Sequence, residues 1–101
     1  MEITEKINPH TNFHIMFYVY LLKSQKFEEL YIGSTNDLRK RLTEHNRGKV
    51  FSTKRKMPYK LLYYEAYSEE SDARRRESML KLHGQARNQL KLRLKNSLNT
   101  I

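Results

Sequence analysis

The chain contains no cysteine and no tryptophan, and only three glycines and two prolines among its 101 residues. Without cysteine it can form no disulfide framework, thiol nucleophile or cysteine-ligated zinc site, which fits a reducing compartment. No apolar run reaches the roughly eighteen residues of a membrane-spanning helix, and the N-terminus lacks the basic start and apolar stretch of a secretory signal. We therefore expect a soluble, cytoplasmic protein with no membrane partner.

Positive charge is abundant, with 20 lysines and arginines against 11 aspartates and glutamates and a formal net charge of +9. Such an excess in a short chain favours a polyanionic partner, DNA or RNA. The length allows one domain and leaves no room for a separate recognition module. We predict a flexible lead-in over 1–14 and a single folded domain over 15–98.

Two segments rich in aromatic residues predict the first two strands. The run IMFYVYLL over 15–22 is almost continuously apolar, as expected of a strand that is covered on both faces. Alternation along this strand places Tyr18, Tyr20 and Leu22 on one face. A shorter strand over 30–33 is expected to pair with it as an antiparallel hairpin.

The rest of the chain alternates helical and extended patterns. Ser34, Thr35 and Asn36 offer three successive N-cap candidates for the first helix, with Asp37 in its first turn. In chain order we then predict a helix to about Arg47, a basic loop over 49–60, a strand over 61–67, a helix that Gly84 ends and a helix over 85–98. The predicted class is α+β, a three-stranded antiparallel sheet flanked by helices in the order strand, strand, helix, strand, helix, helix.

Arg41 and His45 lie on the apolar stripe of the first predicted helix, at helical spacing from Leu38 and Leu42. Because an arginine keeps its charge, Arg41 needs a carboxylate or a phosphate, or else extends to water at the helix edge. Both interpretations are open from periodicity alone.

Glu77 occupies the equivalent position on the second predicted helix, between Ala73 and Leu80. A carboxylate that faces a core is costly unless cations or donors satisfy it. Two arrangements compete here, a salt bridge to Arg76, Arg41 or a tyrosine hydroxyl, and a divalent metal ligated by oxygen. No second acid shares this stripe, so a metal would be completed by water and substrate phosphate.

Tyr20 and Tyr31 come from the two strands of the predicted hairpin, and they could share one face of the sheet if the hairpin register allows. A phenol titrates near pH ~10 and acts as a base near neutrality only if cations lower its pKa. Basic side chains that can hold a phosphate backbone fall in the predicted loop and the last two helices. We predict nucleic-acid contacts from Lys54, Arg55, Lys56, Lys60, Arg75, Arg87 and Lys91.

In their order, these motifs resemble the GIY-YIG nuclease family, in particular its small single-domain group related to the N-terminal domain of the excision-repair nuclease subunit. Tyr18-Val19-Tyr20 stands where the family writes Gly-Ile-Tyr, and Tyr31-Ile32-Gly33 matches its second signature. The segment 34–45 looks like the family's helix with its arginine, Arg41. Residues 73–77 together with Lys81 look like the motif that holds its metal-binding glutamate.

The resemblance implies hydrolysis of DNA phosphodiesters with a divalent metal, Mg²⁺ or Mn²⁺, bound by Glu77, and with no small-molecule cofactor. Arg41 would neutralise charge on the scissile phosphate. Tyr20 or Tyr31 would orient or deprotonate the attacking water, and His45 would assist as a hydrogen-bond partner or proton carrier. The implied activity is an endonuclease, structure-selective and linked to DNA repair or recombination.

A second hypothesis is a non-catalytic DNA- or RNA-binding accessory module that retains the nuclease fold. It is disfavoured by the presence of all five implied catalytic residues, since a decayed nuclease is expected to have lost one. A third is a cationic protein that coats nucleic acid; its binding would depend on salt and be indifferent to Glu77.

Overall fold

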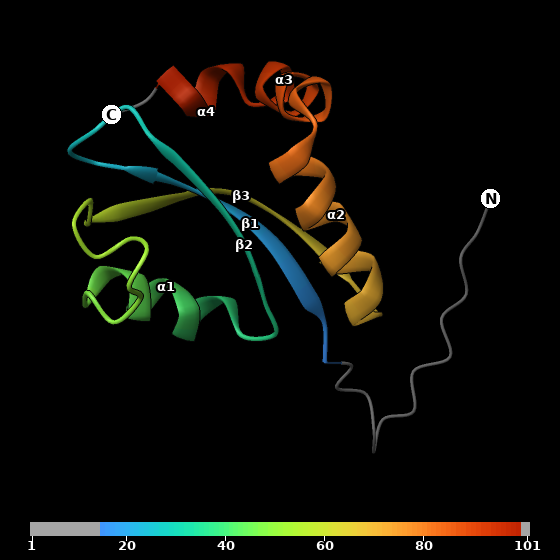
Figure 1. Cartoon of the computed structure of the whole chain (residues 1–101), viewed down its shortest axis with the longest axis horizontal. Coiled ribbons are helices and arrows are strands. Elements are labelled where there is room, and N and C mark those ends of the chain that lie inside the picture. Colours follow the sequence, from blue (N-terminus) through green and yellow to red (C-terminus); the bar gives the residue numbers. More distant parts are fainter. Residues whose placement is uncertain (1–14, 100–101) are drawn as a thin grey trace.

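The computed structural model describes residues 15–99, which form a three-stranded antiparallel sheet flanked by helices (Figure 1). The predicted α+β class and the element order are confirmed; the predicted lead-in over 1–14 lies outside the described residues. The elements are β1 (Phe17–Ser24), β2 (Leu30–Thr35), α1 (Leu38–Asn46), β3 (Tyr59–Tyr67), α2 (Glu70–Leu82), α3 (Gly84–Arg93) and α4 (Lys95–Asn99).

Strand β1 lies in the centre of the sheet, whose strand order is β2-β1-β3. Its odd positions, such as Val19, pack against α2 and α3, and its even positions, such as Leu22, pack on the side of α1. Both of these side chains are almost completely buried. The prediction of a strand covered on both faces is therefore confirmed, and the apolar run of β1 follows from it.

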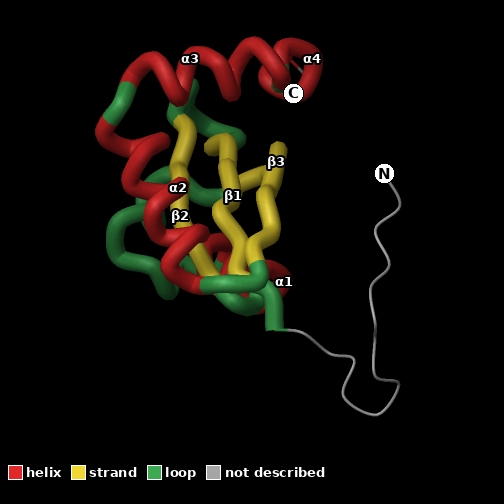
Figure 2. The backbone as a smooth tube through the Cα atoms, turned by 90° about the vertical axis from the view of Figure 1, so that its right-hand side faces the viewer, coloured by secondary structure: helices red, strands yellow, loops and turns green. Residues whose placement is uncertain are grey.

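Helix α1 covers one face of the sheet, and α2 covers the other (Figure 1). Figure 2 shows α3 and α4 running across one end of the strands. Among residues 15–99, no helix combines the length and the apolar character needed to cross a membrane.

The hairpin register sets the two tyrosines side by side. Tyr20 pairs with Gly33, and Leu22 pairs with Tyr31. Because Tyr31 and Gly33 are two residues apart, Tyr20 and Tyr31 project from the same face of the sheet. The hairpin register therefore allows the shared face that the sequence left open for Tyr20 and Tyr31. Strand β2 continues two residues further than predicted, to Thr35.

The predicted start of the first helix is wrong by one to three residues. Asp37 is the N-cap, and its carboxylate accepts the Lys40 amide at 3.1 Å. Ser34 is unavailable for capping because it lies in β2 and donates to Glu77, while Thr35 Oγ1 accepts the Asp37 amide. Neither of these side-chain contacts is visible from local spacing.

The C-terminal helices also differ from the prediction. Gly84 is the first residue of α3 and does not follow α2 directly, since His83 stands between the two helices. The single helix predicted over 85–98 is divided at Leu94, whose backbone leaves the helical region. This bend brings the Leu98 carbonyl to within 3.0 Å of Lys23 Nζ on β1. The predicted apolar stripe remains intact, because Leu90 and Leu94 both join the core.

An ion pair ties α2 to β3. The Arg76 guanidinium donates to both carboxylate oxygens of Glu65 at 3.0 to 3.1 Å, and the hydroxyls of Tyr63 and Tyr67 donate to the same carboxylate. Although burial raises the pKa of Glu65, these donors outweigh that effect and hold the pKa below its ordinary value. Arg76 is therefore not the partner of Glu77 that the sequence suggested.

The Glu65→Ala substitution is expected to destabilise the protein by about 2 kcal/mol, because it removes charge-assisted hydrogen bonds and leaves Arg76 without its carboxylate. Urea unfolding measures this change. Glu28→Ala serves as the control, since the Glu28 side chain is 93% exposed and its pairing with Lys23 contributes little. Equal unfolding midpoints for the two variants would contradict the stabilising role of Glu65.

Candidate active site

Tyr20 is buried at 2% exposure and lies over Gly33 of the neighbouring strand. A β-carbon on Gly33 would come within 2.5 Å of Tyr20 Oη and 3.0 Å of the Tyr31 ring. The glycine is therefore required for space, since its φ angle is not positive. Its missing side chain makes the room in which the Tyr20 hydroxyl lies.

The Tyr20 hydroxyl is paired with His45 of α1. The distance from Tyr20 Oη to His45 Nε2 is 2.8 Å, and His45 Nδ1 lies 2.7 Å from Thr53 Oγ1. His45 and Thr53 are both buried, at 0% and 1% exposure. Three side chains from a strand, a helix and a loop thus form one internal hydrogen-bonded chain.

The network also assigns the histidine tautomer. Thr53 Oγ1 donates to the Val50 carbonyl at 3.4 Å, so it is free to accept a proton from His45 Nδ1. Nε2 then accepts from the Tyr20 hydroxyl, and every donor in the chain has an acceptor. Sequence reasoning missed Thr53, because it lies in an irregular loop where no periodicity marks an inward-facing residue.

Burial shifts the two titrating groups in opposite directions. Burial, together with the nearby Arg41 charge, lowers the pKa of His45 from 6.5 to about 4. It raises the pKa of Tyr20 to about 12, against the lowering effect of Arg41. At neutral pH the pair consists of a neutral imidazole acceptor and a protonated phenol.

Tyr31 links this chain to α2. Its ring centroid lies 4.9 Å from that of His45 and 6.3 Å from that of Tyr20. The Lys81 ammonium lies 5.9 Å from the Tyr31 centroid. Because β2 is an edge strand, Lys81 reaches from the α2 face around that edge to a ring on the α1 face.

Glu77 is held by two donors on the α2 side of the sheet. Its Oε1 accepts from Ser34 Oγ at 2.6 Å, and its Oε2 accepts from Lys81 Nζ at 2.7 Å. Burial raises the pKa of Glu77, but these two donors outweigh it, so the pKa lies below its ordinary value. Glu77 is thus an ionised carboxylate, with Ser34 and Lys81 in place of the partners that the sequence suggested.

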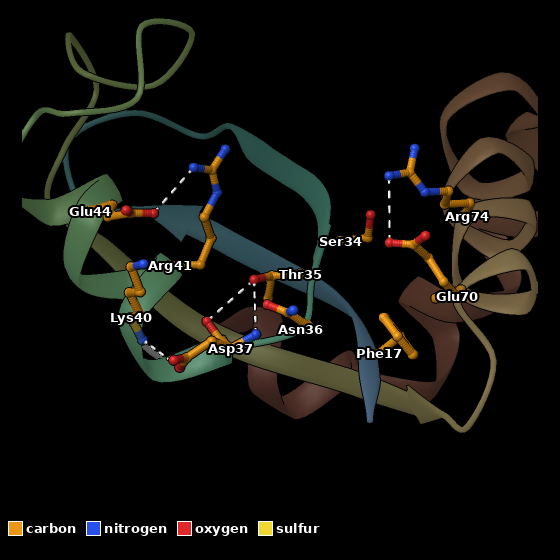
Figure 3. A pocket seen from close by; sticks show the side chains of 11 residues that line it. Phe17, Ser34, Thr35, Asn36, Asp37, Lys40, Arg41, Glu44, Glu70 and Arg74 are labelled. Atoms are coloured by element: carbon orange, nitrogen blue, oxygen red, sulfur yellow. Dashed lines mark hydrogen bonds and ion pairs between the residues drawn. The ribbon is translucent and has the colours of Figure 1, made fainter. Parts of the chain in front are cut away.

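Arg41 borders a cleft of about 360 Å³ between α1 and α2. Figure 3 shows Arg41 on one side of the cleft, Arg74 and Glu70 on the other, and Ser34 between them. The Arg41 guanidinium donates to Glu44 at 3.2 Å, so it has a carboxylate partner within its own helix. Ser34, which donates to Glu77, and Arg41, whose charge acts on Tyr20 and His45, both line this cleft.

A divalent cation fits this donor set only with help from other ligands. Among residues 15–99, no group of three or more histidine, cysteine, aspartate or glutamate side chains could enclose a metal ion. Glu77 offers two anionic oxygens, each of which accepts one hydrogen bond and keeps acceptor capacity. Mg²⁺ is often held in this way, by one or two carboxylates with water and phosphate oxygens.

The predicted nucleic-acid contacts do not form one surface. Lys54 and Arg55 are exposed in the loop that follows α1, Lys60 is exposed on β3 opposite Lys23, and Arg75 is exposed on α2. Lys56 pairs with Glu29, and Lys91 borders a second cleft together with Glu28 and Glu29. Arg87 donates to the Leu80 and Lys81 carbonyls at 3.0 and 2.7 Å, so it caps the end of α2.

Comparison with protein families and with known proteins gives consistent matches. The family model of the GIY-YIG catalytic domain matches residues 16–91. The UPF0213 protein CPE1444 of Clostridium perfringens is 43% identical over 67 residues, which are 65% of this chain and 71% of that protein. The UPF0213 protein SAG0778 of Streptococcus agalactiae is 40% identical over 65 residues, 63% of this chain and 73% of that protein.

A solved structure supports the same grouping. The solution NMR structure of the UPF0213 protein BH0048 from Bacillus halodurans superimposes with a TM-score of 0.52 and 28% sequence identity. The match covers 84% of this chain and 94% of that chain. The names of these relatives state no substrate.

The Gly33→Ala substitution is expected to displace the Tyr20 ring and to destabilise the protein by about 1–3 kcal/mol, as overpacking does elsewhere. Gly84→Ala is the matched control, because its β-carbon would meet only Arg87 at 3.6 Å and alanine favours a helix. Thermal unfolding of both variants measures the difference. If Gly33→Ala melted at or above the temperature of Gly84→Ala, the close packing of Tyr20 on Gly33 would be refuted.

The His45 imidazole is expected to stay neutral at pH 5.5, because its pKa is lowered to about 4. The unfolded chain binds this proton near pH ~6.5, so stability should fall as the pH drops from about 6.5 towards 4. An NMR titration of the His45 ring measures the pKa directly. A midpoint near 6.5 would contradict the buried, neutral state.

Proposed function

The chain belongs to the GIY-YIG catalytic domain family, and on that basis we propose that it is a divalent-metal-dependent endonuclease that hydrolyses DNA phosphodiester bonds. The observation that carries the proposal is the site geometry. A protonated tyrosine backed by a neutral histidine lies on one side of the edge strand β2, and an ionised carboxylate lies on the other. Water activation and cation binding therefore have separate residues within one site.

Glu77 is the residue that would hold Mg²⁺ or Mn²⁺. When bound, the cation polarises the phosphate and stabilises the leaving oxygen. The chain's own contribution is to keep the carboxylate ionised and aimed, through Ser34 and Lys81. The Lys81 side chain is 47% exposed, so its head can swing into water and leave an oxygen of Glu77 free.

Tyr20 and His45 act together on the attacking water. The Tyr20 oxygen accepts a proton from water as its own proton passes to His45 Nε2, 2.8 Å away. This exchange needs no free phenolate, which a pKa of about 12 would make scarce. Thr53 is a positioning residue, because it fixes the proton on Nδ1 and leaves Nε2 as the acceptor.

Arg41 and Tyr31 complete the site. The Arg41 guanidinium borders the cleft, where its planar fork can bind the scissile phosphate and offset charge that grows in the transition state. Tyr31, which contacts His45 and lies near Lys81, orients the water. Lys54, Arg55, Lys60 and Arg75 supply exposed positive charge for the DNA backbone.

RNA is a second polyanion that these exposed lysines and arginines can bind. The biological setting that we propose is cytoplasmic DNA repair or recombination, in which structured DNA is the substrate.

The Glu77→Gln substitution is expected to abolish metal-dependent cutting while DNA affinity at fixed salt changes little, because it removes the anionic ligand and not the cationic surface. Cleavage of labelled duplex, single-stranded, flapped and branched DNA with Mg²⁺, Mn²⁺ or EDTA measures this effect. Asp72→Asn is the control, since Asp72 is an exposed acid of the same helix that does not line the cleft.

Cutting by Glu77→Gln at the parent rate would overturn the assignment of Glu77. Tight binding by the parent protein without cutting on any substrate would instead favour a non-catalytic accessory module.

A further inference from the structure

The loop between α1 and β3, residues 47–58, is anchored to the fold by buried side chains and a hydrogen bond. Gly48, with φ of 71°, turns the chain out of α1, and Val50 and Thr53 are buried at 8% and 1% exposure. Ser24 Oγ of β1 donates to the Lys56 carbonyl at 2.6 Å. The residues between these anchors are consequently held in place although they face solvent (the loop beside α1 in Figure 1).

Phe51 is the outward-facing aromatic residue of this loop. It is 84% exposed, the highest value among the large hydrophobic side chains of residues 15–99. The Lys54 ammonium lies 4.9 Å from the centre of its ring, so one face of the ring carries a cation. The ring remains largely open to an aromatic partner.

A single exposed apolar side chain is ordinary on a protein surface. The surroundings of Phe51 make it different, because Lys49, Lys54 and Arg55 of the same loop are all exposed cations. An open aromatic ring among cations is the arrangement with which proteins bind unpaired nucleotides, by stacking on the base and neutralising the phosphates.

The loop also touches the candidate active site. Thr53, two residues from Phe51, contacts His45, and two residues span at most about 7 Å of chain. The loop that would bind the base is therefore the one that holds His45 in place through Thr53, while Phe51 itself faces solvent. The relevance of this link to cleavage depends on the proposed nuclease function, whereas the stacking itself does not.

We propose that Phe51 is a base-stacking residue and that the loop 47–58 binds an unpaired nucleotide of a single-stranded or locally opened nucleic acid. Within a duplex both faces of each base are covered by its neighbours, so only an unpaired or terminal base can stack on the ring. On the proposed nuclease function, the substrate is consequently a nucleic acid with at least one unpaired base.

The absence of tryptophan from the chain gives a direct test. Phe51→Trp introduces a single tryptophan, whose emission should be quenched by an unpaired oligothymidylate in EDTA and far less by a blunt duplex. Phe27→Trp is the matched control, because Phe27 is also exposed, at 50%, but lies in the β1-β2 connection next to Glu28 and Glu29. Its emission should change little with either nucleic acid.

Affinity provides the second measurement. Phe51→Ala should bind oligothymidylate about tenfold more weakly at fixed salt, a typical loss for one stacked base, with duplex affinity unchanged. Phe51→Leu should resemble Phe51→Ala, because it keeps apolar volume but has no aromatic face.

Either of two results would overturn the proposal: equal quenching of Phe51→Trp by duplex and single strand, or unchanged single-strand affinity in Phe51→Ala. Because EDTA is present and no bond is cut, these results are independent of the cleavage assay. A protein that stacks bases but never cleaves would retain this inference and lose the proposed function.

Discussion

The packing of Tyr20 on Gly33 is the constraint on which the candidate site depends. The ring occupies the space that a side chain on β2 would fill, and from there its hydroxyl reaches His45 on α1. Any displacement of Tyr20 would break a buried hydrogen bond and leave the imidazole with an unsatisfied nitrogen, which is costly at 0% exposure. The strand register, the glycine and the helix position are thus coupled through one phenol, and Thr53 extends the coupling into the basic loop.

The edge position of β2 lets the two halves of the site meet. The sheet separates Tyr20, Tyr31 and His45 from Ser34 and Glu77, because alternate residues of a strand face opposite sides. Lys81 bridges the halves, since it contacts Glu77 on one side and the Tyr31 ring on the other. A further strand beside β2 would block that path, so the small three-stranded sheet is itself a requirement of the site.

Periodicity predicted the features that depend on one element at a time. The two faces of β1, the stripe that carries Arg41 and His45, and the apolar stripe with Leu90 and Leu94 follow from spacing. What sequence reasoning missed depends on contacts between distant elements. Ser34 was predicted to cap the first helix, because its hydrogen bond to Glu77 spans 43 residues and leaves no local signal. Arg76 was predicted as a possible partner of Glu77, but it binds Glu65 of β3. The roles of the catalytic candidates remain predictions, whereas the family membership is confirmed.

The opposite pKa shifts of Tyr20 and His45 restrict the chemistry that the pair can perform. A phenol with a pKa of about 12 is almost never ionised at neutral pH, and an imidazole with a pKa of about 4 is neutral there and lacks the second ring proton that would make it an acid. Neither group alone is a good base or acid there. Joined by a hydrogen bond, they can accept a proton from water only as a unit, and the imidazolium so formed is unfavourable beside Arg41. Anionic phosphate bound at Arg41 would offset this penalty, so in the proposed mechanism the Tyr20–His45 pair would accept a proton from water mainly when substrate is in place.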